Sequence, residues 1–184
     1  GGDGQAAASG IEPYDTPQAL RTDLVAIAHS LTRDGARLLA SGGALGRLIR
    51  TVESCGFHLA TLDLRQNSDV HCRVVTELLR GAGVVADYAA LDEGARTALL
   101  RRELSSPRLL ASPYAEYGAE TLSELEIVRA AATAHALYGS ACITAYIISK
   151  CESVSDMLEV NLMLKEAGLY RPAAPEEAAI MVVP

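Results

Sequence analysis

Residues 56–68 read GFHLATLDLRQNS, and this stretch decides the fold of the chain. A short apolar run with strand-forming residues ends abruptly at Arg65, and a new helix is expected from Ser68. In α/β proteins ligands bind at the carboxyl ends of parallel strands, and the planar fork of an arginine suits a phosphate or a carboxylate. Arg65 is therefore a candidate binding residue. The simpler alternative from the pattern is an ion pair with Asp63, two residues back on the same face of the strand.

The rest of the chain alternates between helical and strand-like patterns. Apolar residues at helical spacing predict two lead-in helices before this stretch and several helices after it. Two further apolar runs, residues 142–149 and 178–183, are expected to be strands, and the first is typical of a parallel strand buried on both faces. The run Thr121–Glu124 has the residue types and spacing of a capping box, which predicts the start of a long helix. Ser68 and Ser153 are expected to cap two other helices.

This order of elements indicates an α/β fold that is strongly helix-rich, containing a partial (β/α)8 TIM-barrel segment with about three parallel strands. We expect residues 1–14 to be a linker or a cloning remnant, and residues 15–56 to be lead-in helices. Residues 57–184 are expected to form the first part of the barrel with inserted helices, in a fragment of a larger enzyme. No Gly-x-Gly-x-x-Gly follows a strand, so a dinucleotide-binding domain is not expected, and no P-loop, nucleophile elbow or HExxH motif is present.

The composition is that of a folded chain with excess negative charge. Hydrophobic residues make up 49 % and charged residues 21 % of the chain, which supports a core and argues against disorder. The net charge of −7 argues against a general affinity for nucleic acid or for an anionic membrane, although local arginines would still bind an anionic substrate. The longest apolar runs are far shorter than the ~20 residues of a membrane span.

The four cysteines do not predict a zinc site. None forms a Cys-x-x-Cys pair, and none stands at a zinc-ligand interval from a histidine. We interpret them as buried or half-buried free thiols in a reducing cytoplasm. They are Cys55, Cys72, Cys142 and Cys151.

Two blocks of the sequence, in this order, resemble phosphoenolpyruvate carboxylase. The first is Leu-Asp-x-Arg-Gln-x-Ser-x-x-His at residues 62–71, and the second is Ala-Tyr-Ile-Ile-Ser at residues 145–149. The second block continues through Ser-Asp at 155–156 and Leu-Lys-Glu-Ala-Gly-Leu at 164–169. Weaker likenesses at the lead-in helix and at Val-Val-Pro, residues 182–184, extend the resemblance over most of the chain from about Thr16 onward.

The resemblance implies a cytoplasmic, homotetrameric (β/α)8-barrel enzyme that adds bicarbonate to phosphoenolpyruvate, giving oxaloacetate and phosphate. This family uses Mg²⁺ or Mn²⁺. The resemblance also implies that Arg65 is a catalytic and substrate-binding residue near the phosphate and carboxylate groups of the substrate, in preference to the ion pair with Asp63.

Other residues of the two blocks are weaker candidates. Asp63 is expected to orient Arg65 or to pack structurally, and Gln66 to support the site from the opposite face of the strand. Ser149 ends the second strand, where its hydroxyl either reaches the site or satisfies a turn. His71 is expected to have a hydrogen-bonded packing role.

The resemblance assigns no metal ligand to this chain. It places the metal-binding acidic residues and a glycine-rich catalytic loop beyond Pro184, and an essential histidine before Gly1. The fragment alone is therefore expected to be inactive. Two departures from the family pattern bear on the site: Asn67 stands where Glu is usual, and Lys150-Cys151 stand where Met and a small residue are usual.

Two other functions stay open. One is a non-catalytic helical binding or regulatory module that has kept the sequence of a barrel segment. The other is a different barrel enzyme that acts on a phosphorylated keto or enol acid.

Overall fold

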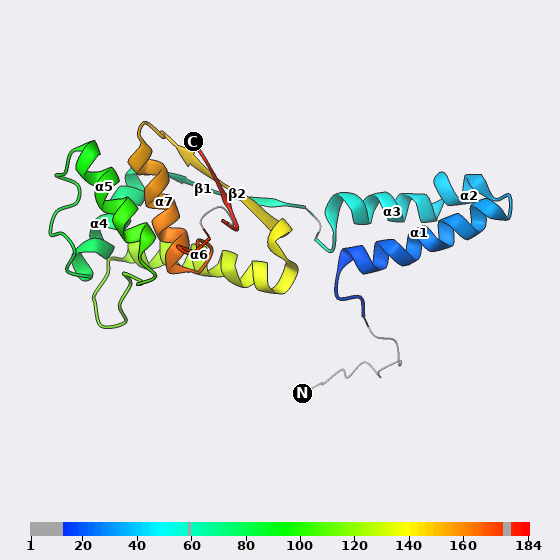
Figure 1. Ribbon diagram of the computed structural model, residues 1–184, viewed down its shortest axis with the longest axis horizontal. Coiled ribbons are helices and arrows are strands. Elements are labelled where there is room, and N and C mark those ends of the chain that lie inside the picture. Colours follow the sequence, from blue (N-terminus) through cyan, green and yellow to red (C-terminus); the bar gives the residue numbers. More distant parts are fainter. Residues whose placement is uncertain (1–12, 59, 175–177) are drawn as a thin grey trace. The chain divides into compact units, whose positions relative to one another are not determined.

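The computed structural model describes residues 13–58, 60–174 and 178–184. These residues form two compact units, one ending at Ala60 and the other running from Thr61 to Pro184 (Figure 1). The linker expected over residues 1–14 lies outside the described residues except for its last two positions. No helix in the described ranges is both long and apolar enough to cross a membrane.

The first unit contains the expected lead-in helices, α1 (Pro17–Arg33) and α3 (Ala44–Cys55), and a short helix α2 (Arg37–Ser41) that the pattern did not predict. Helix α1 starts where the sequence indicated, because the Thr16 hydroxyl accepts a hydrogen bond from the backbone N–H of Ala19 at 3.2 Å. Arg21 on α1 pairs with Glu53 on α3 at 2.7 Å.

The second unit is built on a parallel sheet of three strands, in the order β1 (Leu62–Asn67), β2 (Ile143–Ser149) and β3 (Met181–Val183). The helix-rich α/β class with about three parallel strands is thus confirmed. Strand β1 begins five residues later than the apolar run suggested. Phe57 and His58 lie in a turn after Gly56, whose φ of +59° ends α3 in a conformation that suits glycine.

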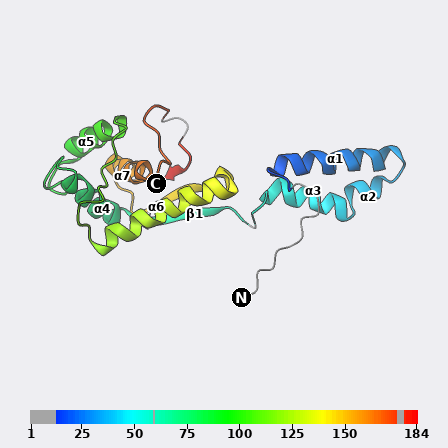
Figure 2. The same ribbon diagram turned by 90° about the horizontal axis from the view of Figure 1, so that it is seen from below.

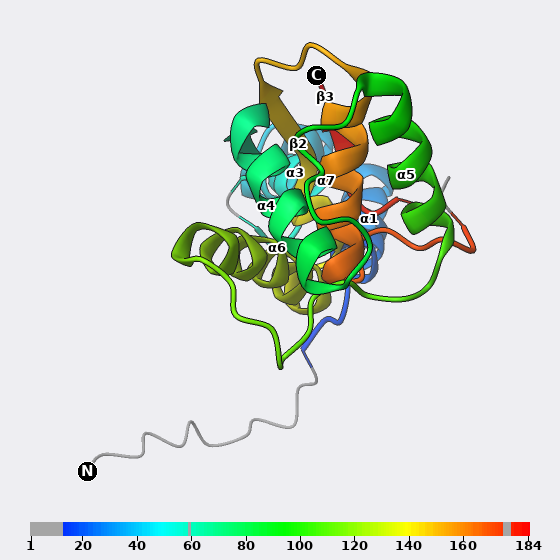
Figure 3. The same ribbon diagram turned by 90° about the vertical axis from the view of Figure 1, so that its left-hand side faces the viewer.

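Four α-helices and one short 3-10 helix accompany the sheet. They are α4 (Ser68–Gly81), α5 (Glu93–Ser105), α6 (Ala119–Tyr138), η1 (Ser140–Cys142) and α7 (Val154–Glu166). Helices α5 and α7 lie side by side (Figure 2), and α4, α6 and α7 also pack against one another (Figure 3). All four cysteines are free, and Cys142 is buried.

The two faces of the sheet differ sharply. On one face Tyr146 and Ile148 are buried, and Leu64 and Val182 pack with them against the core formed by the helices. The side chains between them point to the other face, because neighbours along a strand alternate. On that face Arg65 and Met181 are exposed. We call this second face the uncovered face.

Two predicted helix starts were wrong in detail. Helix α6 begins at Ala119 with Gly118 as its N-cap, so the Thr121–Glu124 run lies inside the helix and is not its capping box. The Gly118 N–H is satisfied by the Glu77 carboxylate at 2.9 Å, and this contact favours the earlier start. Helix α4 is capped by the Asn67 side chain and not by Ser68. At α7 the cap by Ser153 is confirmed, and with Asp156 it forms a full capping box.

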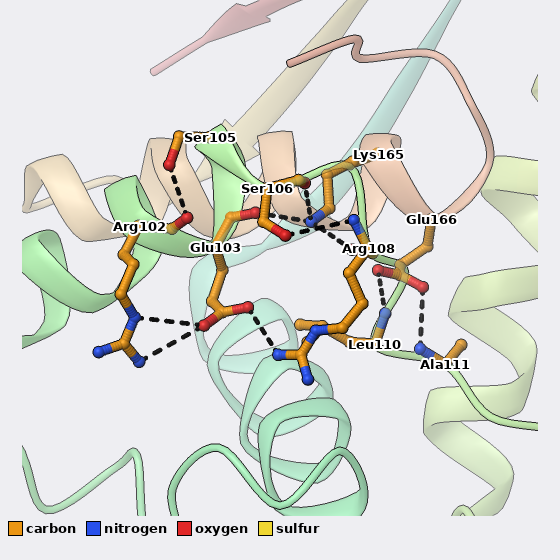
Figure 4. A network of polar contacts seen from close by, with 9 residues as sticks. All are labelled: Arg102, Glu103, Ser105, Ser106, Arg108, Leu110, Ala111, Lys165 and Glu166. Atoms are coloured by element: carbon orange, nitrogen blue, oxygen red, sulfur yellow. Dashed lines mark hydrogen bonds and ion pairs between the residues drawn. The ribbon is translucent and has the colours of Figure 1, made fainter.

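The Leu-Lys-Glu motif at the end of α7 has a structural role (Figure 4). The ammonium of Lys165, which is 2 % exposed, donates hydrogen bonds to the carbonyls of Glu103, Ser106 and Arg108 at 2.6, 3.1 and 2.8 Å. The neighbouring Glu166 accepts from the N–H groups of Leu110 and Ala111, both at 2.9 Å. Together the two side chains bind the segment that leaves α5, in which the backbone has no regular partners.

Replacing Lys165 by methionine should lower the free energy of unfolding by about 2–4 kcal/mol, because three backbone carbonyls lose a buried, charged donor. Urea unfolding of the intact protein measures this change. Lys150→Met is the matched control, since Lys150 is exposed and makes only a 3.6 Å ion pair with Asp69. Equal losses in the two variants would contradict the role of Lys165.

Candidate functional site

Arg65 lies on the uncovered face, one position before Gln66 and two before the end of β1. In the sheet it is level with Ile147 of β2, which in turn is level with Val183 of β3. Arg65 is exposed, and among the described residues it makes no hydrogen bond or ion pair. The simpler alternative, an ion pair with Asp63, is therefore wrong for this structure. The guanidinium keeps all its donors available for a ligand.

A hydrogen bond joins the carboxyl ends of β1 and β2, three residues after Arg65. The Ser68 hydroxyl donates a hydrogen bond to the carbonyl of Lys150 at 2.8 Å. Asn67, level with the exposed Ser149, uses its side-chain oxygen to accept from the N–H of Asp69 at 3.0 Å. Asn67 thus acts as the N-cap of α4. Lys150 itself has a φ of +58°, which turns the chain sharply after β2.

A polar hollow of about 380 Å³ opens beside these strand ends. Its charged side chains are four carboxylates and two cations, so it is a poor match for an anionic substrate. The Glu93 carboxylate accepts from the N–H and hydroxyl of Ser155 at 2.9 and 2.6 Å, and these hydrogen bonds hold its pKa below the usual range. The lining residues are Ser68, Asp69, Glu93, Arg96, Lys150, Glu152, Ser153 and Asp156.

Among the described residues, three pairs of polar side chains that are buried or half-buried lie between the helices and the sheet. Gln66 donates to the Glu124 carboxylate at 2.7 Å, and His71 lies 3.0 Å from the hydroxyl of Tyr146. The hydroxyl of Tyr88 donates to Glu159 at 2.8 Å. The expected packing role of His71 agrees with its complete burial and with its edge-on contact to the Tyr146 ring.

Burial shifts the pKa values of two of these groups in opposite senses. It lowers the pKa of His71 to about 4, against a smaller opposing effect of Asp156. It raises the pKa of Glu159 to about 7, although the hydrogen bond from Tyr88 favours the charged carboxylate. One ring nitrogen of His71 and one oxygen of Glu159 have no hydrogen-bond partner among the described residues.

The described residues do not form a metal site. No group of three or more His, Cys, Asp or Glu side chains within them is arranged to hold a metal ion. The acidic side chains of the polar hollow are engaged with backbone N–H groups, a serine or a lysine in several cases, which fits a structural use.

A family model described as "Phosphoenolpyruvate carboxylase" matches residues 3–184. The chain belongs to this family. A phosphoenolpyruvate carboxylase of Azorhizobium caulinodans is 52 % identical over 97 % of the chain, and that of Caulobacter vibrioides is 48 % identical over 95 %. That of Aromatoleum aromaticum is 54 % identical over 88 %. The chain spans only 18–19 % of the length of these relatives. Because these relatives are named as carboxylases, the alternative of a non-catalytic binding or regulatory module is not favoured.

Sequence reasoning found some features of this region and missed others. It singled out Arg65, Asp63, Gln66 and Ser149, and the structure places the first, second and fourth on one face and Gln66 on the other. It missed Glu124, because that carboxylate had been interpreted as part of a helix cap. A buried glutamate inside a helix, facing a strand amide 58 residues away, leaves no local signal in the sequence.

His71→Gln should flatten the dependence of stability on pH. The imidazole has a pKa near 6.5 in the unfolded chain and about 4 when folded, so its contribution is present above pH 6.5 and is lost as the pH falls toward 4. The stability of the wild type relative to this variant should therefore fall by about 3 kcal/mol between pH 7 and pH 4. Chemical unfolding across this range measures the difference.

Glu159→Gln is the control of opposite sign. The raised pKa of Glu159 favours folding at low pH, and this contribution is lost as the pH rises from 4.5 toward 7. The wild type should therefore gain stability relative to Glu159→Gln as the pH falls. A pH-independent difference between the wild type and His71→Gln would contradict the buried, neutral imidazole.

Proposed function

We propose that this chain forms part of the active site of an enzyme that adds bicarbonate to phosphoenolpyruvate, giving oxaloacetate and phosphate. The observation that carries the proposal is the placement of Arg65 on the uncovered face of a parallel sheet, in a chain of this family. Its exposed guanidinium has the geometry to bind a phosphate or a carboxylate in a bidentate way.

We also propose that β1, β2 and β3 are consecutive strands of a closed (β/α)8 barrel. They are parallel and adjacent in chain order, and the described helices pack against the face that carries Leu64, Tyr146 and Val182. Purely parallel sheets are normally buried on both faces, so the uncovered face requires further structure opposite it. Closure of the ring would bury Ile147 and Val183 in its interior and leave Arg65 near the open end.

The proposed reaction requires positive charge at the site, and Arg65 supplies part of it. An oxygen of bicarbonate attacks phosphorus and the bond between phosphorus and the enol oxygen breaks, which gives carboxyphosphate and an enolate. The carboxyphosphate gives up its hydroxyl proton and its carbon–oxygen bond to the phosphate breaks, which releases CO₂ and phosphate. The enolate carbon then attacks this CO₂ to form oxaloacetate. Every participant except CO₂ is anionic, so cationic groups must offset the charge that moves during these steps. In this proposal Arg65 binds the phosphate or carboxylate of the substrate. Asp63 and Ser149 support it from the same face, and Gln66 does so from the other.

The parent enzyme is proposed to be a cytoplasmic homotetramer that uses Mg²⁺ or Mn²⁺. A divalent ion would supply further positive charge beside the transferring phosphoryl group. The residues of this chain that the structure describes do not fit such an ion, so we assign no step to it here. Free thiols at all four cysteines fit the reducing compartment.

Arg65→Ala in the full-length enzyme should lower kcat/KM for phosphoenolpyruvate by about a hundredfold or more, because one preorganised donor to the reacting charges is lost. Steady-state assays of oxaloacetate formation measure this effect. Arg73→Ala is the matched control, since Arg73 is an exposed arginine of α4 that pairs with Glu120 at 2.8 Å, and it should leave kcat/KM close to the wild-type value. Unchanged kinetics in a folded Arg65→Ala enzyme would refute the assignment.

A preparation of residues 1–184 alone should form no oxaloacetate from phosphoenolpyruvate and bicarbonate, even with Mg²⁺ present. The physical reason is that the described residues offer no metal ligand set and no second cation beside Arg65 on the uncovered face. The coupled assay used for the full-length enzyme serves here, with that enzyme as the positive control. Sustained turnover by the segment would show that the site is more complete than proposed.

A further inference from the structure

The hydrogen bond between Gln66 and Glu124 joins β1 to α6 at the residue that follows Arg65. The amide of Gln66 donates to the Glu124 carboxylate at 2.7 Å, and Glu124 is only 6 % exposed. A buried carboxylate is costly unless donors satisfy it, and a bond from an amide to a charged oxygen is among the stronger hydrogen bonds in proteins. This pair therefore fixes the distance between strand and helix.

Both the nitrogen and the oxygen of the Gln66 side-chain amide make hydrogen bonds. While its amide nitrogen donates to Glu124, its carbonyl oxygen accepts a hydrogen bond from the backbone N–H of Asn67 at 2.9 Å. The two contacts agree on which end of the amide faces the carboxylate, because only the nitrogen has a proton to donate. The side chain and the peptide group that follows it are thus held as one rigid unit.

Helix α6, which carries Glu124, also packs against β2. Burial and, secondly, the negative charge of Glu124 raise the pKa of the Tyr146 hydroxyl on β2. Tyr146 is also the partner of His71 on α4. The Glu124 carboxylate of α6 therefore lies on the covered side of β1, where it binds the residue that follows Arg65.

We propose that Glu124 is a positioning residue for Arg65. By holding Gln66 on the covered face, Glu124 fixes the rotation of the end of β1, and side-chain alternation then sets the direction of the Arg65 side chain on the other face. Glu124 touches no substrate in this proposal. The inference rests on the proposed function, since it concerns the same arginine.

The test is a double-mutant cycle in the full-length enzyme. Glu124→Ala should lower kcat/KM for phosphoenolpyruvate by about tenfold or more, because a misplacement on the order of 1 Å is costly at a reacting centre. The same substitution in an Arg65→Ala background should have almost no further effect, since the group that it positions is already absent. A purely structural role predicts equal effects in both backgrounds, and that result would overturn the proposal.

Two further variants test the same hydrogen bond. Glu124→Gln retains an oxygen acceptor for Gln66 and should restore most of the activity lost in Glu124→Ala. If Glu124→Ala fails to fold, the double variant Gln66→Met/Glu124→Met removes both partners of the buried hydrogen bond, and the backbone N–H of Asn67 loses its side-chain acceptor. It should fold and still show a reduced kcat/KM. Wild-type kinetics in a folded double variant would also overturn the proposal.

The matched control is Glu120→Ala. Glu120 lies on the same helix, one turn earlier, and binds Arg73 of α4 at 2.8 Å, but it is exposed, and its hydrogen bonds within the described part of the chain go to that helix and not to a strand. Its removal should leave kcat/KM near the wild-type value in both backgrounds. The kinetics of Arg65→Ala alone separate the two proposals. Wild-type kcat/KM in Arg65→Ala would contradict the proposed function. A lowered kcat/KM in Arg65→Ala, together with equal effects of Glu124→Ala in both backgrounds, would contradict only the positioning role of Glu124.

Discussion

The second unit depends on the alternation of side chains along β1, which sends Gln66 to the covered face and Arg65 to the uncovered face. A shift of one residue in the pairing of β1 with β2 would exchange these two roles. The register is held on the covered side by the Glu124 carboxylate and at the strand end by the bond from Ser68 to the Lys150 carbonyl. Arg65 is exposed on the face opposite the one where Gln66 binds Glu124.

The ionisable side chains of the second unit differ in burial and in hydrogen-bond partners. Lys165 and Glu166 are buried, and backbone carbonyl and N–H groups satisfy them. His71 is buried with one ring nitrogen 3.0 Å from the Tyr146 hydroxyl and the other without a partner among the described residues, and its lowered pKa keeps it neutral. In contrast, Arg65 has neither a partner among the described residues nor a burial cost. Because the Arg65 guanidinium is exposed and makes no structural contact among the described residues, in a chain of this family, it is available to bind a ligand.

Much of the fold could be predicted from the sequence, because the deciding signals are local. Apolar spacing gave the main helices, the apolar run at residues 142–149 gave β2, and Ser153 with Asp156 gave the cap of α7. Most of the misses came from contacts distant in sequence. The Gly118 N–H at the start of α6 binds Glu77, 41 residues away, and Glu124 binds a strand 58 residues away. The cap of α4 by Asn67 is local, but the Ser68 hydroxyl that was expected there binds the Lys150 carbonyl, 82 residues away. For the site, the sequence singled out Arg65 but not the carboxylate behind it.

The most direct measurement is an experimental structure of the full-length enzyme with a phosphoenolpyruvate analogue bound. The account predicts that the Arg65 guanidinium lies within hydrogen-bond distance of a phosphate or carboxylate oxygen of the ligand. It also predicts that Ile147 and Val183 lie at the same level inside a closed ring of strands. A structure in which Arg65 pairs with a protein carboxylate away from the ligand, or in which helices cover its face of the sheet, would contradict the account.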